Sequence, residues 1–464
     1  MQERACPRID MAMIVRAVDK AFNPVDLHRM NPARYPHLLK STAQGRYDML
    51  FACPGASLKL GANGSLAVPA GVSPSGNDFL ATFDRWWRDQ RTAVSEQGGT
   101  PFTGGWFVYL GYELAAQIET RLQLPSTDKL LPTAIATRFM TAVILDHETG
   151  ETRIAGEAGQ EENVAAIAAD ILALPPAAAS STDTGIKVVA VGEEEPQRYL
   201  DAVSRIHEYI REGDVFQVNL SRQWDIYLKG SITAATLFDQ LAAHNPSPFS
   251  GLASWPGVAI VSSSPERLVA VRDGLVETRP IAGTRPRSSS LQADTAYSQE
   301  LLAHPKERAE HIMLIDLERN DLGRLCVPGT IEVNELMVLE SYAHVHHIVS
   351  NVRGRLREDI SPGEVIRAVF PGGTITGCPK VRCMEIIAEL EQQARSAYTG
   401  SMGYINRDGS MDMNILIRSM ISSGEHLRLR AGAGIVADSN ALAELDETRA
   451  KARGLLRAVG LDQA

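Results

Sequence analysis

Residues 258–275 read VAIVSSSPERLVAVRDGL, and this stretch decides the class of fold. Two runs rich in β-branched residues, 258–263 and 267–271, are followed by Asp273-Gly274, a pair typical of a tight hairpin turn. A hairpin joins its strands in antiparallel order. Further strands are predicted from the same composition at residues 215–220, 411–421 and 426–435.

Helices are predicted between these strands. Tyr199, Val203, Ile206 and Ile210 recur at helical spacing, and Gly213 follows as a stop signal. The other predicted helices cover residues 161–174, 305 to about 318, a segment opened by Pro379, and 441–458. Because strands and helices alternate without a βαβ rhythm, the sequence predicts a mixed α+β fold rather than a doubly wound sheet.

The totals exclude several classes of protein. The chain has 464 residues, 44% of them hydrophobic, and a net charge of −10. The acidic total argues against a nucleic-acid partner, and the absence of a long uncharged apolar run predicts no membrane span. Near the N-terminus, Glu3, Arg4, Arg16 and Asp19 surround a very short apolar patch, which predicts no secretory signal. Five scattered cysteines form no disulfide framework, so a reducing cytoplasm is the expected location.

One break in composition predicts the domain organisation. Residues 174–185 read LPPAAASSTDTG, which is typical of a linker. We therefore expect an N-terminal region over residues 1–185 that packs along a catalytic region over residues 186–464. A long surface loop within one domain is the alternative.

Three sequence patterns could take part in binding or catalysis, and each also has a purely structural explanation. The loop before Pro379 and Ala431-Gly432-Ala433-Gly434 can offer backbone amides to an anion, although neither is a nucleotide-binding motif. Carboxylates share helical faces at Glu307 and Glu310, and at Glu444 and Glu447 with Lys451. From spacing alone, the glycine-rich loops are better explained as tight turns and the carboxylates as solvent-exposed helix faces.

The third pattern is a group of histidines at His344, His346 and His347. A zinc site would need further ligands, and the sequence has no CxxC or HExxH motif. A single histidine can act as an acid or base near neutral pH, but a structural histidine is more common.

Longer motifs resemble one family. They are PIAGTRPR (280–287), ERAEHIMLIDLERNDLGR (307–324), PGGTITGCPKVRCMEII (371–387), AGAGIVADS (431–439) and DET (446–448). In this order they closely resemble the chorismate-utilising family, which contains anthranilate, aminodeoxychorismate, isochorismate and salicylate synthases. The resemblance covers roughly residues 195–460. It implies an α+β fold of two antiparallel sheets packed face to face, with helices outside and the substrate site between the sheets.

The resemblance also implies a role for each matching residue. Glu310 and Glu447 would hold Mg²⁺, which grips one carboxylate of chorismate. Glu266 would be the general acid for the departing 4-hydroxyl, and His347 would lie beside the ring. Substrate contacts are expected from Thr284, Gly283, Tyr398, Arg418, Gly432, Ala433, Gly434 and Lys451. Chorismate is a dianion, so magnesium, arginine and backbone amides suit it.

Two positions bear on which member of the family the chain resembles. Hydrating members use a lysine to activate water at the position of Gln217, and a glutamine cannot deprotonate water. Ammonia is therefore the expected nucleophile. Ala282 gives the PIAGT motif usual in anthranilate synthases, whereas typical aminodeoxychorismate synthases have a nucleophilic lysine there.

Other segments also resemble either aminodeoxychorismate synthases or anthranilate synthases. Val345-His346-His347, GGTITG and SSSPERL look more like aminodeoxychorismate synthases, and residues 37–41 (HLLKS) loosely resemble the tryptophan-binding LLES segment of anthranilate synthases, from which Lys40 departs. We expect amination to 4-amino-4-deoxychorismate through a non-covalent C2-amino intermediate, for 4-aminobenzoate and folate synthesis. Anthranilate synthase and a catalytically silent chorismate-binding subunit are the alternatives.

The source of ammonia is expected to be another protein. A glutamine amidotransferase needs a cysteine nucleophile at a sharp turn, and none of the cysteines has that context. The resemblance implies a heterodimer with a separate glutamine amidotransferase subunit.

Overall fold

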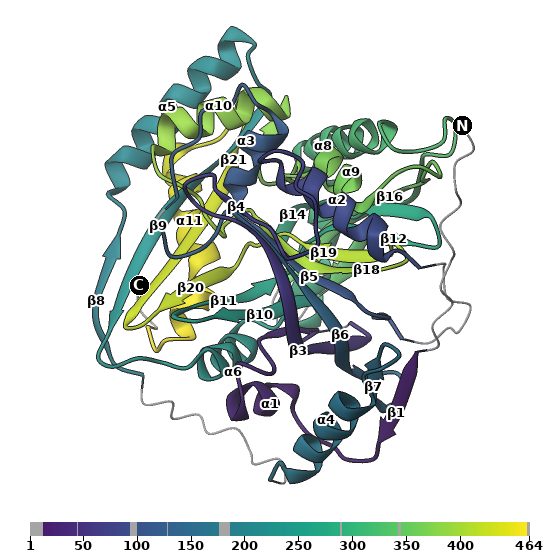
Figure 1. The fold of residues 1–464 in the computed structure, drawn as a ribbon. Coiled ribbons are helices and arrows are strands. Elements are labelled where there is room, and N and C mark those ends of the chain that lie inside the picture. Colours follow the sequence, from purple (N-terminus) through teal and green to yellow (C-terminus); the bar gives the residue numbers. More distant parts are fainter. Residues whose placement is uncertain are drawn as a thin grey trace, which may run out of the picture.

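The computed structural model alternates helices and strands along the chain (Figure 1). It describes residues 13–43, 45–92, 100–127, 129–175, 186–287, 290–341 and 345–461. The helices are α1 (Pro24–Met30), α2 (Phe79–Gln90), a 3₁₀ turn (Tyr112–Leu114), α3 (Ala115–Ile118), α4 (Glu161–Ala173), α5 (Pro196–Glu212), α6 (Ala234–His244), α7 (Leu291–Ala303), α8 (Pro305–Gly323), α9 (Pro362–Val369), α10 (Lys380–Glu391) and α11 (Ala441–Arg457).

The strands divide between the two halves of the chain. The first half contains β1 (Ile14–Val18), β2 (His37–Lys40), β3 (Tyr47–Leu60), β4 (Leu66–Ala67), β5 (Gly105–Leu110), β6 (Ala134–Asp146) and β7 (Thr152–Gly156). The second contains β8 (Val188–Glu193), β9 (Gln217–Leu228), β10 (Phe249–Trp255), β11 (Val258–Ser264), β12 (Arg267–Arg272), β13 (Leu275–Thr278), β14 (Ile281–Pro286), β15 (Glu332–Ser341), β16 (Val345–Arg355), β17 (Gly377–Cys378), β18 (Ser401–Asn406), β19 (Met411–Asn414), β20 (Ser419–Ser423) and β21 (His426–Ile435).

The predicted helices are present, and their ends follow local rules. Helix α5 ends at Gly213, whose φ of +84° suits a residue without a Cβ. Helix α8 begins at Pro305 and continues past the predicted end at about residue 318. Ser361 and Glu364 form a capping box at the start of α9. Local chemistry therefore explains where these helices begin and end.

All pairings between the described strands are antiparallel. The long strands β3 and β6 pair with each other along most of their length. They connect two layers of strands. The first layer contains β5, β18, β19, β12, β13, β14, β16 and β15, and the second contains β2, β10, β11, β20, β21, β9 and β8.

The two layers pack face to face. The ring of His37 in β2 stacks on Phe107 of β5, with centroids 4.1 Å apart, and Trp255 of β10 lies 5.7 Å from Tyr109 of β5. These residues belong to one buried cluster drawn from both layers, except His37, which is itself buried. The predicted α+β fold of packed antiparallel sheets is confirmed.

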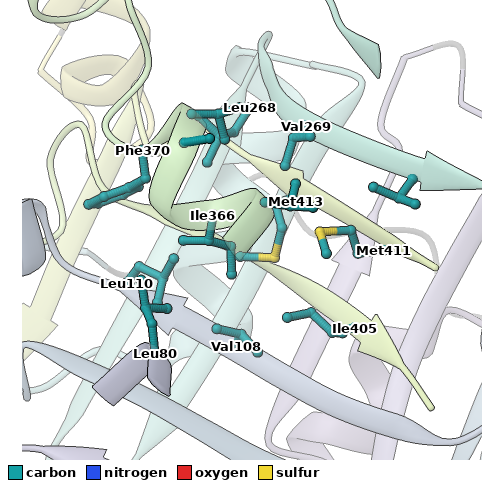
Figure 2. Close-up of a cluster of buried hydrophobic side chains, with 14 of the residues drawn as sticks. Leu80, Val108, Leu110, Leu268, Val269, Ile366, Phe370, Ile405, Met411 and Met413 are labelled. Atoms are coloured by element: carbon teal, nitrogen blue, oxygen red, sulfur yellow. The ribbon is translucent and has the colours of Figure 1, made fainter. Parts of the chain in front are cut away.

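Helices cover the outer faces of the layers (Figure 1). Figure 2 shows Ile366 of α9 among Leu268 of β12 and Met413 of β19, in the cluster that covers the first layer. On the second layer, Leu237 of α6 and Leu455 of α11 belong to the equivalent cluster. Apolar side chains are therefore buried on both faces of the layers, which stabilises their packing.

One predicted strand is wrong. Residues 411–421 form two strands, β19 and β20, separated by residues 415–418, because the chain crosses here from the first layer to the second. Arg418 at the end of this crossing has a φ of +52°, in the left-handed region. The strand predicted at residues 215–220 begins at Gln217 and extends to Leu228.

Each layer contains strands from both halves of the sequence. Strand β2 pairs with β10, and β5 pairs with β18. Residues 176–185 lie outside the described residues, so the boundary at residue 185 stays a prediction. Among the residues that the structure describes, no helix has the length and apolar character needed to cross a membrane.

Candidate active site

Glu266 lies in the short crossing between β11 and β12, and its side chain is 5% exposed. Burial raises the pKa of this carboxyl to about 7. The Thr374 side chain, the Ile281 backbone amide and the charges of Lys451 and Arg418 oppose this rise without offsetting it. A carboxyl with this pKa is partly protonated at neutral pH, so it can donate a proton to a leaving group.

Strand β14 places backbone groups beside Glu266. The register with β16 shifts between Ala282 and Thr284, and Gly283 at the shift has a φ of +69°. A Cβ on Gly283 would lie 2.8 Å from Glu307 Oε2, so this position requires glycine. Ala282 is buried and pairs with Ile348. The side chain of Thr284 lies outside the described part of the structure.

His347 on β16 faces this bulge. Its Nδ1 lies 3.3 Å from the carbonyl oxygen of Gly283, which can only accept, so Nδ1 carries the proton. Burial lowers the pKa of His347 to about 4. The ring is therefore neutral at pH 7, and its Nε2 is an acceptor. His346 lies on the opposite face and contacts Asp294, while His344 is outside the described residues.

The glycines of β21 create room for two polar side chains. A Cβ on Gly432 would lie 2.7 Å from Tyr398 Oη, and a Cβ on Gly434 would lie 2.2 Å from Gln217 Nε2. Between them, the Ala433 side chain points to the opposite face of the strand and packs in the core. Only the backbone of Ala433 is therefore available to the site. Gln217 Oε1 is buried and has no hydrogen-bond partner among the described residues.

Two cations lie in the same region. The Arg418 guanidinium makes no hydrogen bond or ion pair within the described ranges, and burial lowers its pKa, an effect that Tyr398, Glu447 and Glu266 oppose. Lys451 Nζ donates to the Gly432 carbonyl oxygen at 3.0 Å and lies 2.6 Å from Glu447 Oε1. A half-buried guanidinium that makes no ion pair with the described residues, in the same region as a lysine, suits an anionic ligand.

The predicted metal ligands come from two helices. Glu310 is partly buried on α8, which contacts β14 and β16, and Glu447 lies on α11, which runs along β21. Among the described residues, no group of three or more His, Cys, Asp or Glu side chains is placed to hold a metal. Two carboxylates nevertheless fit Mg²⁺, which commonly takes one or two protein carboxylates together with ligand oxygens and water.

Sequence analysis missed Glu318. Its side chain is 7% exposed, and burial raises the pKa of its carboxyl to about 7, with Asp321 and Glu266 among the charges that add to the rise. Glu318 shares the buried face of α8 with Ile315 and Leu322, at helical spacing. A carboxylate within that apolar stripe was the available signal.

Comparison with known proteins gives a consistent result. A family model described as chorismate binding enzyme matches residues 55–457. Aminodeoxychorismate synthase component 1 of Bacillus subtilis (strain 168) is 38% identical over 437 residues, covering 92% of each chain. An anthranilate synthase component I-like protein of Synechocystis sp. is 41% identical over 359 residues, covering 77% of this chain and 73% of that protein.

A solved structure agrees with these relatives. The crystal structure of anthranilate synthase component I from Streptococcus pneumoniae TIGR4 superposes with a TM-score of 0.78 at 30% identity. The match covers 89% of this chain and 92% of that one.

Proposed function

Because the chain belongs to the chorismate-binding enzyme family, we propose that it aminates chorismate to 4-amino-4-deoxychorismate. One observation carries the choice of product: Val345-His346-His347 and the GGTITG and SSSPERL segments resemble those of aminodeoxychorismate synthases. Relatives named for both products match the chain over similar lengths, so the choice depends on these motifs.

Amination rather than hydration is supported by Gln217. Its amide lies against Gly434 in the site and cannot act as a base at neutral pH. No lysine replaces it at position 282, where Ala282 is a buried apolar residue. Ammonia, which carries its own lone pair, needs no such base.

The site residues then have complementary roles. Arg418, Lys451, Tyr398 and the backbone around Gly432 would bind a substrate carboxylate. Mg²⁺ held by Glu310 and Glu447 would supply a positive charge for the other carboxylate. Neutral His347 would lie beside the ring.

Glu266 supplies the proton for the leaving group. As ammonia forms a bond to C2, the ring double bond shifts and the C4–O bond breaks. The proton of Glu266 leaves with the 4-hydroxyl as water, and the new ammonium group returns a proton to the carboxylate. A second ammonia then forms a bond to C4 as the ring double bond shifts back and the C2–N bond breaks. The C2 amine takes the proton of Glu266 and leaves as ammonia, and the new C4 ammonium group returns a proton to the carboxylate.

Anthranilate synthesis is the second candidate, and Ala282 favours it because it gives the PIAGT motif. The same C2-amino intermediate would then lose pyruvate. Leu39, Lys40 and Ser41, within the HLLKS segment, also line a cavity of about 340 Å³. This is the segment that resembles the tryptophan-binding part of anthranilate synthases.

Product identification separates the candidates. The pure chain is mixed with chorismate, MgCl₂ and an ammonium salt, with and without a lyase that converts aminodeoxychorismate to 4-aminobenzoate. Formation of 4-aminobenzoate in the tube with the lyase supports the proposal. Anthranilate without the lyase contradicts it in favour of the second candidate. No product in either tube favours a catalytically silent chorismate-binding subunit or a chain that acts only with its amidotransferase partner.

A further inference from the structure

Glu113 is a buried carboxylate that the proposed chemistry does not use. It follows β5 in the 3₁₀ turn Tyr112–Leu114, in the first half of the chain, and is 9% exposed. Its Oε1 accepts the Arg395 N–H at 2.7 Å, and both of its oxygens accept the Ser396 N–H at 3.2 Å. A carboxylate that accepts successive backbone N–H groups fixes the backbone to which they belong.

The backbone held in this way leads to Tyr398. Ser396 and Thr399, on either side of it, have φ values of +53° and +60°, in the left-handed region. Residues with a Cβ adopt this conformation only where surrounding contacts hold them there. The Tyr112 N–H donates to the Ser396 carbonyl oxygen at 2.9 Å, and the Thr399 N–H donates to that of Leu416 at 2.8 Å. The 3₁₀ turn therefore holds the first strained residue, and the crossing between β19 and β20 holds the second.

The ring of Tyr398 is held by Arg395. The guanidinium carbon of Arg395 lies 5.5 Å from the centre of the Tyr398 ring and 5.0 Å from that of the Tyr112 ring. Arg395 Nη2 lies 2.6 Å from Glu391 Oε1, and both side chains are 1% exposed. Tyr398 extends into the candidate active site, where a Cβ on Gly432 would lie 2.7 Å from its hydroxyl oxygen. The backbone and the ring of Tyr398 are thus held by separate contacts, and its hydroxyl reaches the site.

We propose that Glu113 is a positioning residue for chorismate binding, which acts by holding Tyr398 in place. The inference rests on the proposed function, in which Tyr398 helps to bind a substrate carboxylate. Glu113 acts through the backbone amides of Arg395 and Ser396 and does not touch the substrate. A shift of this backbone moves the Tyr398 hydroxyl and weakens its contact with the anion. The first half of the chain thereby contributes to the substrate site from outside it.

Calorimetric titration of the full chain with chorismate and MgCl₂, without ammonia, tests this role. Glu113→Gln keeps the size of the side chain but removes its charge and one acceptor oxygen. It is expected to weaken chorismate binding about tenfold, because hydrogen bonds to a charged group are lost. In assays with an ammonium salt, the KM for chorismate should rise by a similar factor, while kcat stays within about twofold of wild type.

A second background shows whether Glu113 acts through Tyr398. Tyr398→Phe removes the hydroxyl that reaches the site, so this substitution should weaken chorismate binding by itself. In the Tyr398→Phe background, Glu113→Gln should weaken binding by less than about twofold. An equal loss of affinity with and without the tyrosine hydroxyl overturns the proposal, and so does unchanged affinity in the Glu113→Gln variant.

Asp84→Asn is the matched control. Asp84 is also a buried carboxylate, 6% exposed, and it accepts the Gly363 N–H at 2.8 Å, but it joins α2 to α9. Whatever its effect on the thermal midpoint, this variant should keep wild-type affinity for chorismate. A loss of affinity equal to that of Glu113→Gln overturns the proposal, because the effect is then a general loosening of the fold. Binding is measured without a nucleophile, so a wild type that binds chorismate without aminating it overturns the proposed function alone.

Discussion

Replacement of Gly434 by alanine tests how tightly the site is built. Gly434 pairs with Asn219 across β21 and β9 and has an ordinary strand backbone, so alanine causes no conformational strain. The added Cβ would lie 2.2 Å from Gln217 Nε2, with Cδ at 3.3 Å and Cγ at 3.6 Å. An ordinary contact is about 3.5 Å, so the Gln217 amide must move by more than about 1 Å.

The cost follows from this displacement. Overpacking of a buried site costs about 1–3 kcal/mol, and the lower backbone entropy of alanine in the unfolded chain returns about 0.4–1 kcal/mol. A net destabilisation of about 1–2 kcal/mol is expected for Gly434→Ala. In a Gln217→Ala background the amide is absent, and the same substitution should be neutral or slightly stabilising. The double-mutant cycle should therefore give a coupling of about 1–2 kcal/mol.

Urea unfolding of the four proteins measures this coupling, with amination from ammonium as a second readout. The double variant should recover stability without recovering activity, since it lacks the amide that we propose lies beside the incoming ammonia. Gly192→Ala on β8 is the control, because a Cβ there meets nothing closer than 3.9 Å. Equal stability of the Gly434 and Gly192 variants, or additivity in the cycle, refutes the proposed contact.

Three further predictions concern the two buried carboxyl groups and the proposed magnesium ligand Glu310. Glu266→Gln should lower the amination rate at least 100-fold. The wild-type rate, corrected for free ammonia, should fall as the pH rises through about 7, because Glu266 then loses its proton. A wild-type rate that does not change with pH contradicts the role of Glu266 as the acid. Burial raises the folded-state pKa of Glu318 from 4.5 to about 7, so its contribution to stability falls as the pH rises between these values. Glu318→Gln should therefore be more stable than wild type at pH 8, by up to ~3 kcal/mol, with a smaller difference at pH 5; urea unfolding showing no such pH dependence contradicts this. Glu310→Gln should weaken Mg²⁺ binding at least tenfold by calorimetry without changing the thermal midpoint in metal-free buffer; unchanged binding removes Glu310 from the metal site.

Much of the fold was predictable because its signals are local. The helical spacing before Gly213, the proline at the start of α8 and the Asp273-Gly274 turn each act over a few residues. The glycines of β21 could be identified as a motif, but the sequence does not show which side chains pack against them. Side chains from β9 and the segment before β18 fill the space they leave, and this packing depends on tertiary structure.

The rest required the structure for a physical reason. Residues 411–421 have a continuous β composition, and composition does not show where a strand changes layer. Glu318 lies in the apolar stripe of α8, but a charged side chain is ordinarily exposed, so its burial depends on what covers α8. The environment that raises its pKa includes Glu266, which lies 52 positions earlier in the sequence.

The two segments that cross between the layers hold Glu266 and Arg418 in the same region of the structure. Glu266 lies where β11 passes into β12, and Arg418 lies where β19 passes into β20. The Ile415 N–H donates to the Glu266 carbonyl oxygen, and the Ser263 N–H donates to that of Arg418, both at 3.0 Å. Each crossing thus fixes the other through backbone hydrogen bonds.

This arrangement has an energetic consequence. A left-handed arginine costs about 1–3 kcal/mol, and the packed strands on both sides of the crossing hold it in place. Glu266 and Arg418 are therefore positioned by backbone and not by a salt bridge to each other. A direct ion pair would ionise the acid and occupy the guanidinium. Keeping the pair apart on rigid crossings leaves one group able to give a proton and the other able to bind an anion.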